Sequence, residues 1–138
     1  MRRAKILIAD DVREIRDFLR FCLQDDYDII LARNGEEAWE LFNAEKPDIV
    51  LSDCVMPRMT GLELLERIRN MSFRPETPVV IITAATSSSD IADGLWGKIS
   101  GSDAFISKPF VPKQVQETVA KCLGRAPNAP AAPPGKLD

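Results

Sequence analysis

The chain has 138 residues, of which 45% are hydrophobic and 28% charged, with a formal net charge of −3 and a pI near 5.1. These values are typical of one globular domain, and the acidic balance argues against a nucleic-acid-binding domain. Because the chain contains no histidine, histidine-based acid–base chemistry, histidine metal ligands and a phosphohistidine carrier are excluded.

Five short apolar runs alternate with amphipathic segments along the chain. Strands are expected at residues 5–9, 28–32, 48–52, 78–83 and 103–106. Such runs, ending in turn residues, are typical of parallel strands buried on both faces. Five βα units with right-handed crossovers predict a three-layer α/β sandwich with a five-stranded parallel sheet and five helices. The flavodoxin-like strand order 2-1-3-4-5 is the common one at this size.

Four of the five helices have clear signals. The first presents an apolar stripe with helical spacing, formed by Ile15, Phe18, Leu19, Cys22 and Leu23. The second follows Asn34-Gly35, a turn-and-cap pair, and the third begins at Thr60, which forms a capping box with Glu63. The fifth begins near Pro112 and has an apolar stripe of Val111, Val115, Val119 and Cys122.

The fourth helix, expected in segment 84–102, has a weak signal because glycines interrupt its apolar stripe. Each mid-helix glycine costs about 1 kcal/mol relative to alanine. A destabilised surface helix and a conformational switch element both fit this pattern. The composition then changes to a Pro/Ala-rich segment at 125–138, which predicts a disordered tail or linker after a folded domain at 1–124.

The three cysteines, Cys22, Cys54 and Cys122, show no metal-binding or redox spacing. We expect buried thiols in a reducing, cytoplasmic setting. The apolar run that follows the basic N-terminus is too short for a signal peptide, and no segment approaches the length of a membrane span.

Charged residues follow three of the predicted strands. Asp10 and Asp11 follow the first strand, Asp53 the third and Lys108 the fifth. Because the carboxyl ends of parallel strands meet at one edge of a sheet, these side chains are expected to lie close together. Three carboxylates in one crevice repel one another unless a hard cation such as Mg²⁺ is bound. An aspartate beside Mg²⁺ is also a known type of phosphoryl acceptor.

Taken singly, these residues have ordinary structural explanations. An aspartate at a strand end commonly caps a helix, Thr83 would form a turn or cap, and Phe105 would be a core aromatic. It is the combination at one sheet edge that favours a functional site. Pro109 makes the peptide bond after Lys108 a candidate for the cis form.

The ordered set of motifs resembles the receiver domain of bacterial two-component response regulators, which has the CheY-like fold. The resemblance covers residues 4–123 and rests on Asp10-Asp11, Asp53-Cys54-Val55-Met56-Pro57 with Gly61, Thr83-Ala84, and Phe105 with Lys108-Pro109-Phe110. It implies a phosphorylatable signalling domain rather than an enzyme.

The resemblance also implies roles for the acidic residues. Asp53 would accept a phosphoryl group from a sensor histidine kinase or a phosphotransfer protein. Asp11, Asp53 and the backbone carbonyl of Val55 would ligate Mg²⁺, and Asp10 would act mainly through water.

Further implied roles concern the switch. Thr83, Ala84 and Lys108 would bind the phosphoryl group, and Phe105 would be the switch aromatic, although it lacks the hydroxyl of a tyrosine. The face formed by the fourth helix, fifth strand and fifth helix would bind an output protein or domain, or a second copy of the chain. Direct contact with nucleic acid or membrane is not expected. Val55 and Ala85 cannot orient an attacking water, so slow self-dephosphorylation is expected.

Other interpretations can be compared with these motifs. A phosphatase of the haloacid dehalogenase type would place a second aspartate where Val55 stands, and an FMN binder would need a phosphate-cradling loop where Asp10-Asp11 stand. A phosphorylation-independent pseudo-receiver, a pure interaction module, remains an open alternative. The cognate kinase, the output and the choice between a stand-alone receiver and part of a longer regulator also remain open.

Overall fold

The computed structural model describes residues 3–83 and 102–124. The elements, in chain order, are β1 (Lys5–Ala9), α1 (Arg13–Leu23), β2 (Asp28–Ala32), α2 (Gly35–Glu45), β3 (Ile49–Asp53), α3 (Gly61–Met71), β4 (Val79–Thr83), β5 (Ala104–Ser107) and α5 (Pro112–Cys122). The predicted fourth helix and the predicted tail at 125–138 lie outside the described residues. Among the helices of these two ranges, none has the length and apolar character needed to cross a membrane.

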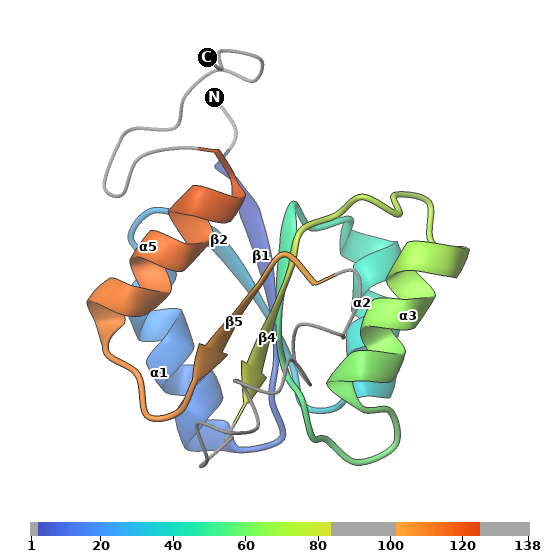
Figure 1. Cartoon of the computed structure of the whole chain (residues 1–138), viewed down its shortest axis with the longest axis horizontal. Helices are drawn as coiled ribbons and strands as arrows, with labels where there is room; N and C mark the ends of the chain where they lie inside the picture. The colour runs from blue at the N-terminus through green and yellow to red at the C-terminus, as the bar shows by residue number, and fades with distance from the viewer. Residues whose placement is uncertain (1–2, 84–101, 125–138) are drawn as a thin grey trace, which may run out of the picture.

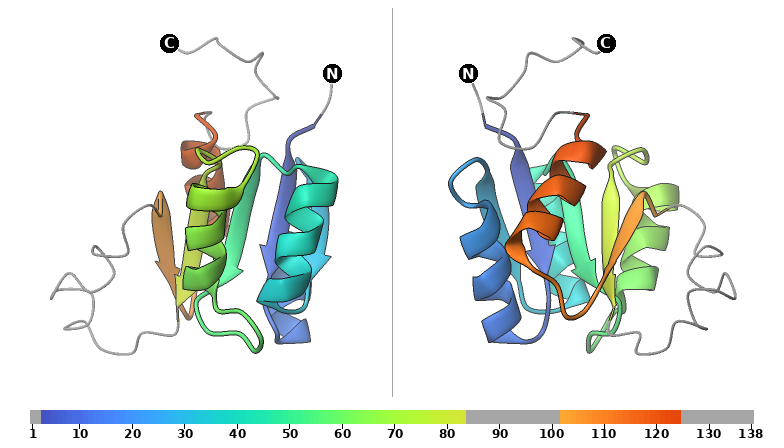
Figure 2. Two further views of the ribbon diagram at one scale, coloured as in Figure 1. Left: turned by 90° about the vertical axis from the view of Figure 1, so that its right-hand side faces the viewer. Right: turned by 60° about the vertical axis from the view of Figure 1, so that its left-hand side comes forward.

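The strands form one parallel sheet in the order β2-β1-β3-β4-β5. This order confirms the predicted CheY-like topology, and each strand lies within one residue of its predicted bounds. Helices α1 and α5 cover one face of the sheet and α2 and α3 cover the other (Figure 1). Figure 2 shows the same layers from two further sides. Every residue of β3 and β4 is buried because both faces of the central strands are covered.

Alternate side chains of the central strands supply two separate apolar cores. Ile6, Ile8, Leu51 and Ile82 pack toward α1 and α5. Leu7, Val50 and Ile81 pack on the other side, toward α2 and α3. This period of two is what a strand buried on both faces requires, and it fixes the register of the sheet. The rigid centre holds the carboxyl ends of β1, β3, β4 and β5 in fixed relative positions.

The predicted starts of α2, α3 and α5 are confirmed. The side chain of Asn34 accepts a hydrogen bond from the Glu37 backbone N–H, and Thr60 and Glu63 form the capping box of α3. The predicted stripe of α5 needs two corrections. Val111 is the N-cap and is 60% exposed, because it precedes the first helical turn, and Cys122, the last helical residue, is only half-buried.

Candidate functional site

The register of the sheet brings four strand ends to one edge. Ala9 of β1 pairs with Ser52 of β3, so the residues that follow them, Asp10 and Asp53, are neighbours. On the other side of β3, Thr83 of β4 pairs with Ser107 of β5, directly before Lys108. The edge therefore collects residues that are far apart in the sequence, as expected from the parallel topology.

Three carboxylates meet at this edge. Asp10, Asp11 and Asp53 each offer an oxygen atom, and these atoms all lie within 4.8 Å of one another. Asp10 and Asp53 are buried, at 0% and 6% exposure, whereas Asp11 is exposed. The cluster is thus open to solvent on the side of Asp11 and enclosed by protein on the side of Asp10.

Lys108 is the cation of the cluster. Its Nζ atom lies 3.5 Å from Oδ1 of Asp53 and 3.7 Å from Oδ2 of Asp10. The Lys108 side chain is 23% exposed, so one ammonium partly offsets two buried carboxylates. Since three acids face one lysine, the cluster keeps an excess of negative charge.

Asp10 has one satisfied and one unsatisfied oxygen. Its Oδ1 atom accepts a hydrogen bond of 2.9 Å from the Val12 backbone N–H, the local turn bond expected of an aspartate at a strand end. Its Oδ2 atom is buried and accepts no hydrogen bond, and its contact with the Lys108 ammonium is a longer ion pair of 3.7 Å. An unsatisfied buried oxygen costs about 1–3 kcal/mol, which a turn residue alone would not require.

The pKa values of the two buried carboxyl groups reflect this environment. Burial raises the pKa of Asp10 above its ordinary value, against the lowering effects of the Val12 hydrogen bond and of Lys108. Burial also raises the pKa of Asp53, and the charge of Asp10 raises it further. Both shifts mean that the buried site disfavours the ionised carboxylates, and a perturbed acid at a strand edge is a candidate functional group.

A bound divalent cation fits this donor set. The three side chains are oxygen ligands of the kind that Mg²⁺ prefers, and a buried oxygen that accepts no hydrogen bond lies among them. Val55 follows Asp53 by two residues in the loop between β3 and α3, and its side chain is 74% exposed. The role of its backbone carbonyl as a ligand remains a prediction.

The remaining predicted residues occupy β4, β5 and their ends. Thr83 is buried, and its carbonyl accepts a 2.8 Å hydrogen bond from the Lys108 backbone N–H. The Lys108–Pro109 peptide bond is cis, as its sequence suggested. Ala84 lies outside the described residues. Phe105 is 38% exposed and belongs to neither apolar core, so its single-residue interpretation as a core aromatic is wrong; Ile106, on the opposite face of β5, is buried.

The sequence analysis missed one residue that supports the site. Arg16 of α1 donates a 2.8 Å hydrogen bond from its guanidinium to the backbone carbonyl of Asp10. Because of its spacing to Leu19 and Leu23, Arg16 lies at the edge of the buried stripe of α1. A long cationic side chain at such an edge was the sequence signal that could have identified it.

Comparison with known proteins defines the family. A family model described as the response regulator receiver domain matches residues 6–120. The chain belongs to the response regulator receiver domain family, which confirms the resemblance inferred from its motifs. Receiver domains of this family are signalling domains of two-component systems, and they typically bind Mg²⁺ at an acidic pocket.

Individual relatives agree with this assignment. The "Probable transcriptional regulator ycf27" of Porphyridium aerugineum is 35% identical over 130 residues, which are 94% of this chain and 52% of that protein. The chain thus spans about half the length of the ycf27 proteins that it matches. The chemotaxis protein CheY4 of Vibrio cholerae is 30% identical with a TM-score of 0.75, over 87% of this chain and 98% of that one. A putative response regulator from Chloroflexus aurantiacus reaches a TM-score of 0.81 at 26% identity, over 90% of this chain and 100% of that one.

Proposed function

We propose that Asp53 accepts a phosphoryl group from a sensor histidine kinase or a phosphotransfer protein, and that this reaction requires Mg²⁺. The observation that carries the proposal is the position of the Asp53 carboxylate. It lies 3.5 Å from the Lys108 ammonium, and one of its oxygen atoms lies within 4.8 Å of oxygen atoms of Asp10 and Asp11. Positioning and charge neutralisation are the two contributions that phosphoryl transfer needs from a protein.

In the proposed reaction, a carboxylate oxygen of Asp53 attacks the phosphorus of a phosphohistidine. The nitrogen–phosphorus bond breaks, and its electron pair stays on the imidazole nitrogen of the donor. Lys108 then pairs with the new phosphoryl oxygens, because its ammonium already lies beside the accepting carboxylate. Thr83, which the register places next to β5 at the same edge, contributes its hydroxyl group to the same oxygens.

Asp10, Asp11, Asp53 and the backbone carbonyl of Val55 are the groups that we propose to hold Mg²⁺, with Asp10 acting through water. When bound, this cation supplies the positive charge that neutralises the approaching phosphoryl group. The exposed position of Asp11 leaves the cluster open to solvent and to a donor protein.

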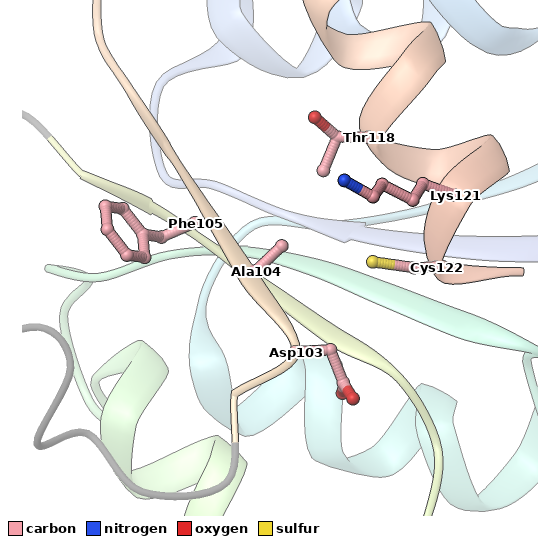
Figure 3. Close-up of a pocket in the computed structure, with 6 residues that line it drawn as sticks. All are labelled: Asp103, Ala104, Phe105, Thr118, Lys121 and Cys122. Carbon is pink, nitrogen blue, oxygen red and sulfur yellow. The ribbon is translucent and has the colours of Figure 1, made fainter.

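The proposed output surface includes β5 and α5. A pocket between these elements is lined by Asp103, Ala104, Phe105, Thr118, Lys121 and Cys122. Figure 3 shows the ring of Phe105 pointing away from the α5 side chains that line this pocket. Phe105 is therefore partly exposed on the side of β5 opposite α5, where a change of its rotamer would alter the surface offered to an output protein, an output domain or a second copy.

We propose a domain boundary near residue 124, with 125–138 acting as a linker or tail. The Pro/Ala-rich composition of that segment supports the boundary. The ycf27 relative is about twice as long as the matched region, which supports the interpretation of residues 125–138 as a linker.

The test is phosphorylation by acetyl phosphate in millimolar Mg²⁺, followed by intact mass spectrometry. The wild-type chain is expected to gain one phosphoryl group, and chelation of Mg²⁺ or the substitution Asp53→Ala should abolish the gain. Asp25→Ala, at an exposed position before β2, is the matched control and should react like the wild type. A wild-type chain that neither reacts nor binds beryllofluoride with Mg²⁺ would overturn the proposal and favour the pseudo-receiver.

A further inference from the structure

We infer that the first turn of α2 positions the loop between β3 and α3, residues 54–60, and thereby sets the affinity of the acidic cluster for Mg²⁺. Gly35 and Arg58 are the positioning residues. The inference rests on the proposed function, because the loop follows Asp53 directly and contains the Val55 carbonyl that we propose as a ligand.

Gly35 forms the closest contact between the helix and the loop. A Cβ atom added to Gly35 would overlap the backbone carbonyl oxygen of Met59 and would lie 2.7 Å from the Met59 Cβ atom. Real Cβ atoms do not approach other atoms so closely, and the clash involves backbone atoms that a rotamer change cannot move away. The start of α2 and the end of the loop are therefore in direct backbone contact.

An ion pair at the surface also links the first turn of α2 with the loop. The guanidinium of Arg58 lies 3.1 Å from Oε1 of Glu36, the residue that follows Gly35. Arg58 holds a positive φ of 74°, in the left-handed region that side-chain-bearing residues rarely adopt. Such a backbone conformation persists only where surrounding contacts stabilise it, and the ion pair with Glu36 is one such contact.

The loop also makes contacts that do not involve the first turn of α2. Met56 and Met59 are buried in the core beneath α2 and α3, and the Gly61 N–H donates to the Cys54 carbonyl at 3.0 Å. These contacts hold the buried side and the two ends of the loop. The contacts of Met59 and Arg58 with α2 add a further restraint on the same loop, whose Val55 side chain is exposed.

This arrangement connects α2 with the metal site. A shift of the first turn of α2 would displace the peptide groups near Met59, which belong to the same short loop as Val55. Partners that bind near Glu36 and Arg58 could alter Mg²⁺ affinity without touching the carboxylates. The two side chains are 57% and 65% exposed and are therefore accessible to a partner.

Gly35→Ala is the first test. The added methyl group forces the helix or the loop to move by about 1 Å. Disturbing the groups that orient metal ligands typically costs about 10–100-fold in metal affinity, so Mg²⁺ binding is expected to weaken about tenfold or more. Isothermal titration with Mg²⁺ alone gives the affinity, and thermal unfolding in EDTA reports the metal-free stability. Amide hydrogen exchange of residues 54–60 should increase in the same variant. An affinity equal to that of the wild type would overturn the inference.

Arg58→Gln separates mechanical positioning from simple charge effects. Removing a positive charge near an acidic cluster should by itself tighten Mg²⁺ binding, whereas loss of the contact with α2 should weaken it. We expect Kd to rise about threefold, in the range of an exposed ion pair, and Arg58→Lys to restore part of the affinity. This test also stands if Gly35→Ala does not fold.

Arg20→Gln is the matched control. It removes the same charge from an exposed pair on α1, since Arg20 lies 3.8 Å from Asp17 and makes no ion pair with α2 or the loop among the described residues. The control is expected to leave Mg²⁺ affinity unchanged or slightly tighter. Equal effects of Arg20→Gln and Arg58→Gln would contradict positioning. Failure of the wild type itself to bind Mg²⁺ would instead overturn the proposed function.

Discussion

Lys108 and Asp53 form an ion pair of 3.5 Å between the ends of two strands that are not neighbours in the sheet. The same ammonium lies 3.7 Å from Asp10, and among the described residues no other side chain forms an ion pair with either carboxylate. One lysine therefore partly neutralises the charge of two buried carboxylates. This relationship determines how the domain should respond to loss of charge, to pH and to a cation.

The substitution Lys108→Ala is expected to lower the free energy of unfolding of the metal-free domain by about 2 kcal/mol, because it leaves two buried carboxylates without a cation. Urea denaturation in EDTA measures this loss. Added Mg²⁺ should stabilise the variant more than the wild type, since the cation replaces the missing charge. Lys113→Ala, which removes an exposed lysine from an i,i+4 pair on α5, should change stability by about 0.5 kcal/mol or less. Equal losses in the two variants would contradict the role assigned to Lys108.

Asp53→Asn should stabilise the metal-free domain at neutral pH. Burial and the charge of Asp10 raise the pKa of Asp53 in the folded state, so its ionised form opposes folding. This cost is absent below the unfolded-state pKa of about 3.9 and grows as the pH rises through the higher folded-state pKa.

The free energy of unfolding of Asp53→Asn should therefore exceed that of the wild type by about 1 kcal/mol near pH 7.5, and the difference should shrink toward about pH 4.5. Urea denaturation in EDTA at a series of pH values measures it. Asp25→Asn, at an exposed site, should show no such trend. A variant that is less stable than the wild type at neutral pH would show that the Lys108 pair outweighs the cost of burial.

The sheet and the acidic cluster could be predicted from the sequence because their signals are local. Each central strand is a short apolar run, and Asp10, Asp53 and Lys108 stand directly at strand ends, so the parallel topology alone brings them together. Strand bounds shifted by one residue do not alter that conclusion. The caps at Asn34 and Thr60 were also predictable, because a capping side chain bonds within its own turn.

Contacts between distant segments could not be predicted in the same way. The overlap of Gly35 with Met59 and the bond from Arg16 to the Asp10 carbonyl depend on how far a helix is set from a loop, which no local pattern encodes. The exposure of Phe105 depends on which face of β5 the core covers, since the neighbouring Ile106 on the other face is buried, and the local sequence does not encode that choice.

Gly61→Ala should be strongly destabilising. An added Cβ atom would overlap the backbone carbonyl oxygen of Asp53, and the side-chain oxygen of the buried Ser52 lies 3.0 Å away. The Asp53 carbonyl cannot move without disturbing the end of β3, so a loss of about 3 kcal/mol is expected, at the upper end of overpacking effects. Thermal or urea unfolding measures it. Leu62→Ala, one residue later at a position that is 36% exposed, should cost clearly less. Similar losses for both variants would show that the loop relaxes around the new side chain.

Val55→Asn should shorten the lifetime of the phosphorylated domain. The Val55 side chain is 74% exposed beside the proposed phosphoryl position, and a hydrocarbon there cannot hold an attacking water. An amide at this position can orient water by a hydrogen bond, so dephosphorylation should accelerate up to about tenfold, below the range for a full general base. The measurement follows the decay of the phosphorylated mass after acetyl phosphate is removed. Val111→Asn makes the same exchange at an exposed position after β5 and should leave the rate unchanged. Equal decay rates in Val55→Asn and the wild type would show that water access at this position does not control the lifetime.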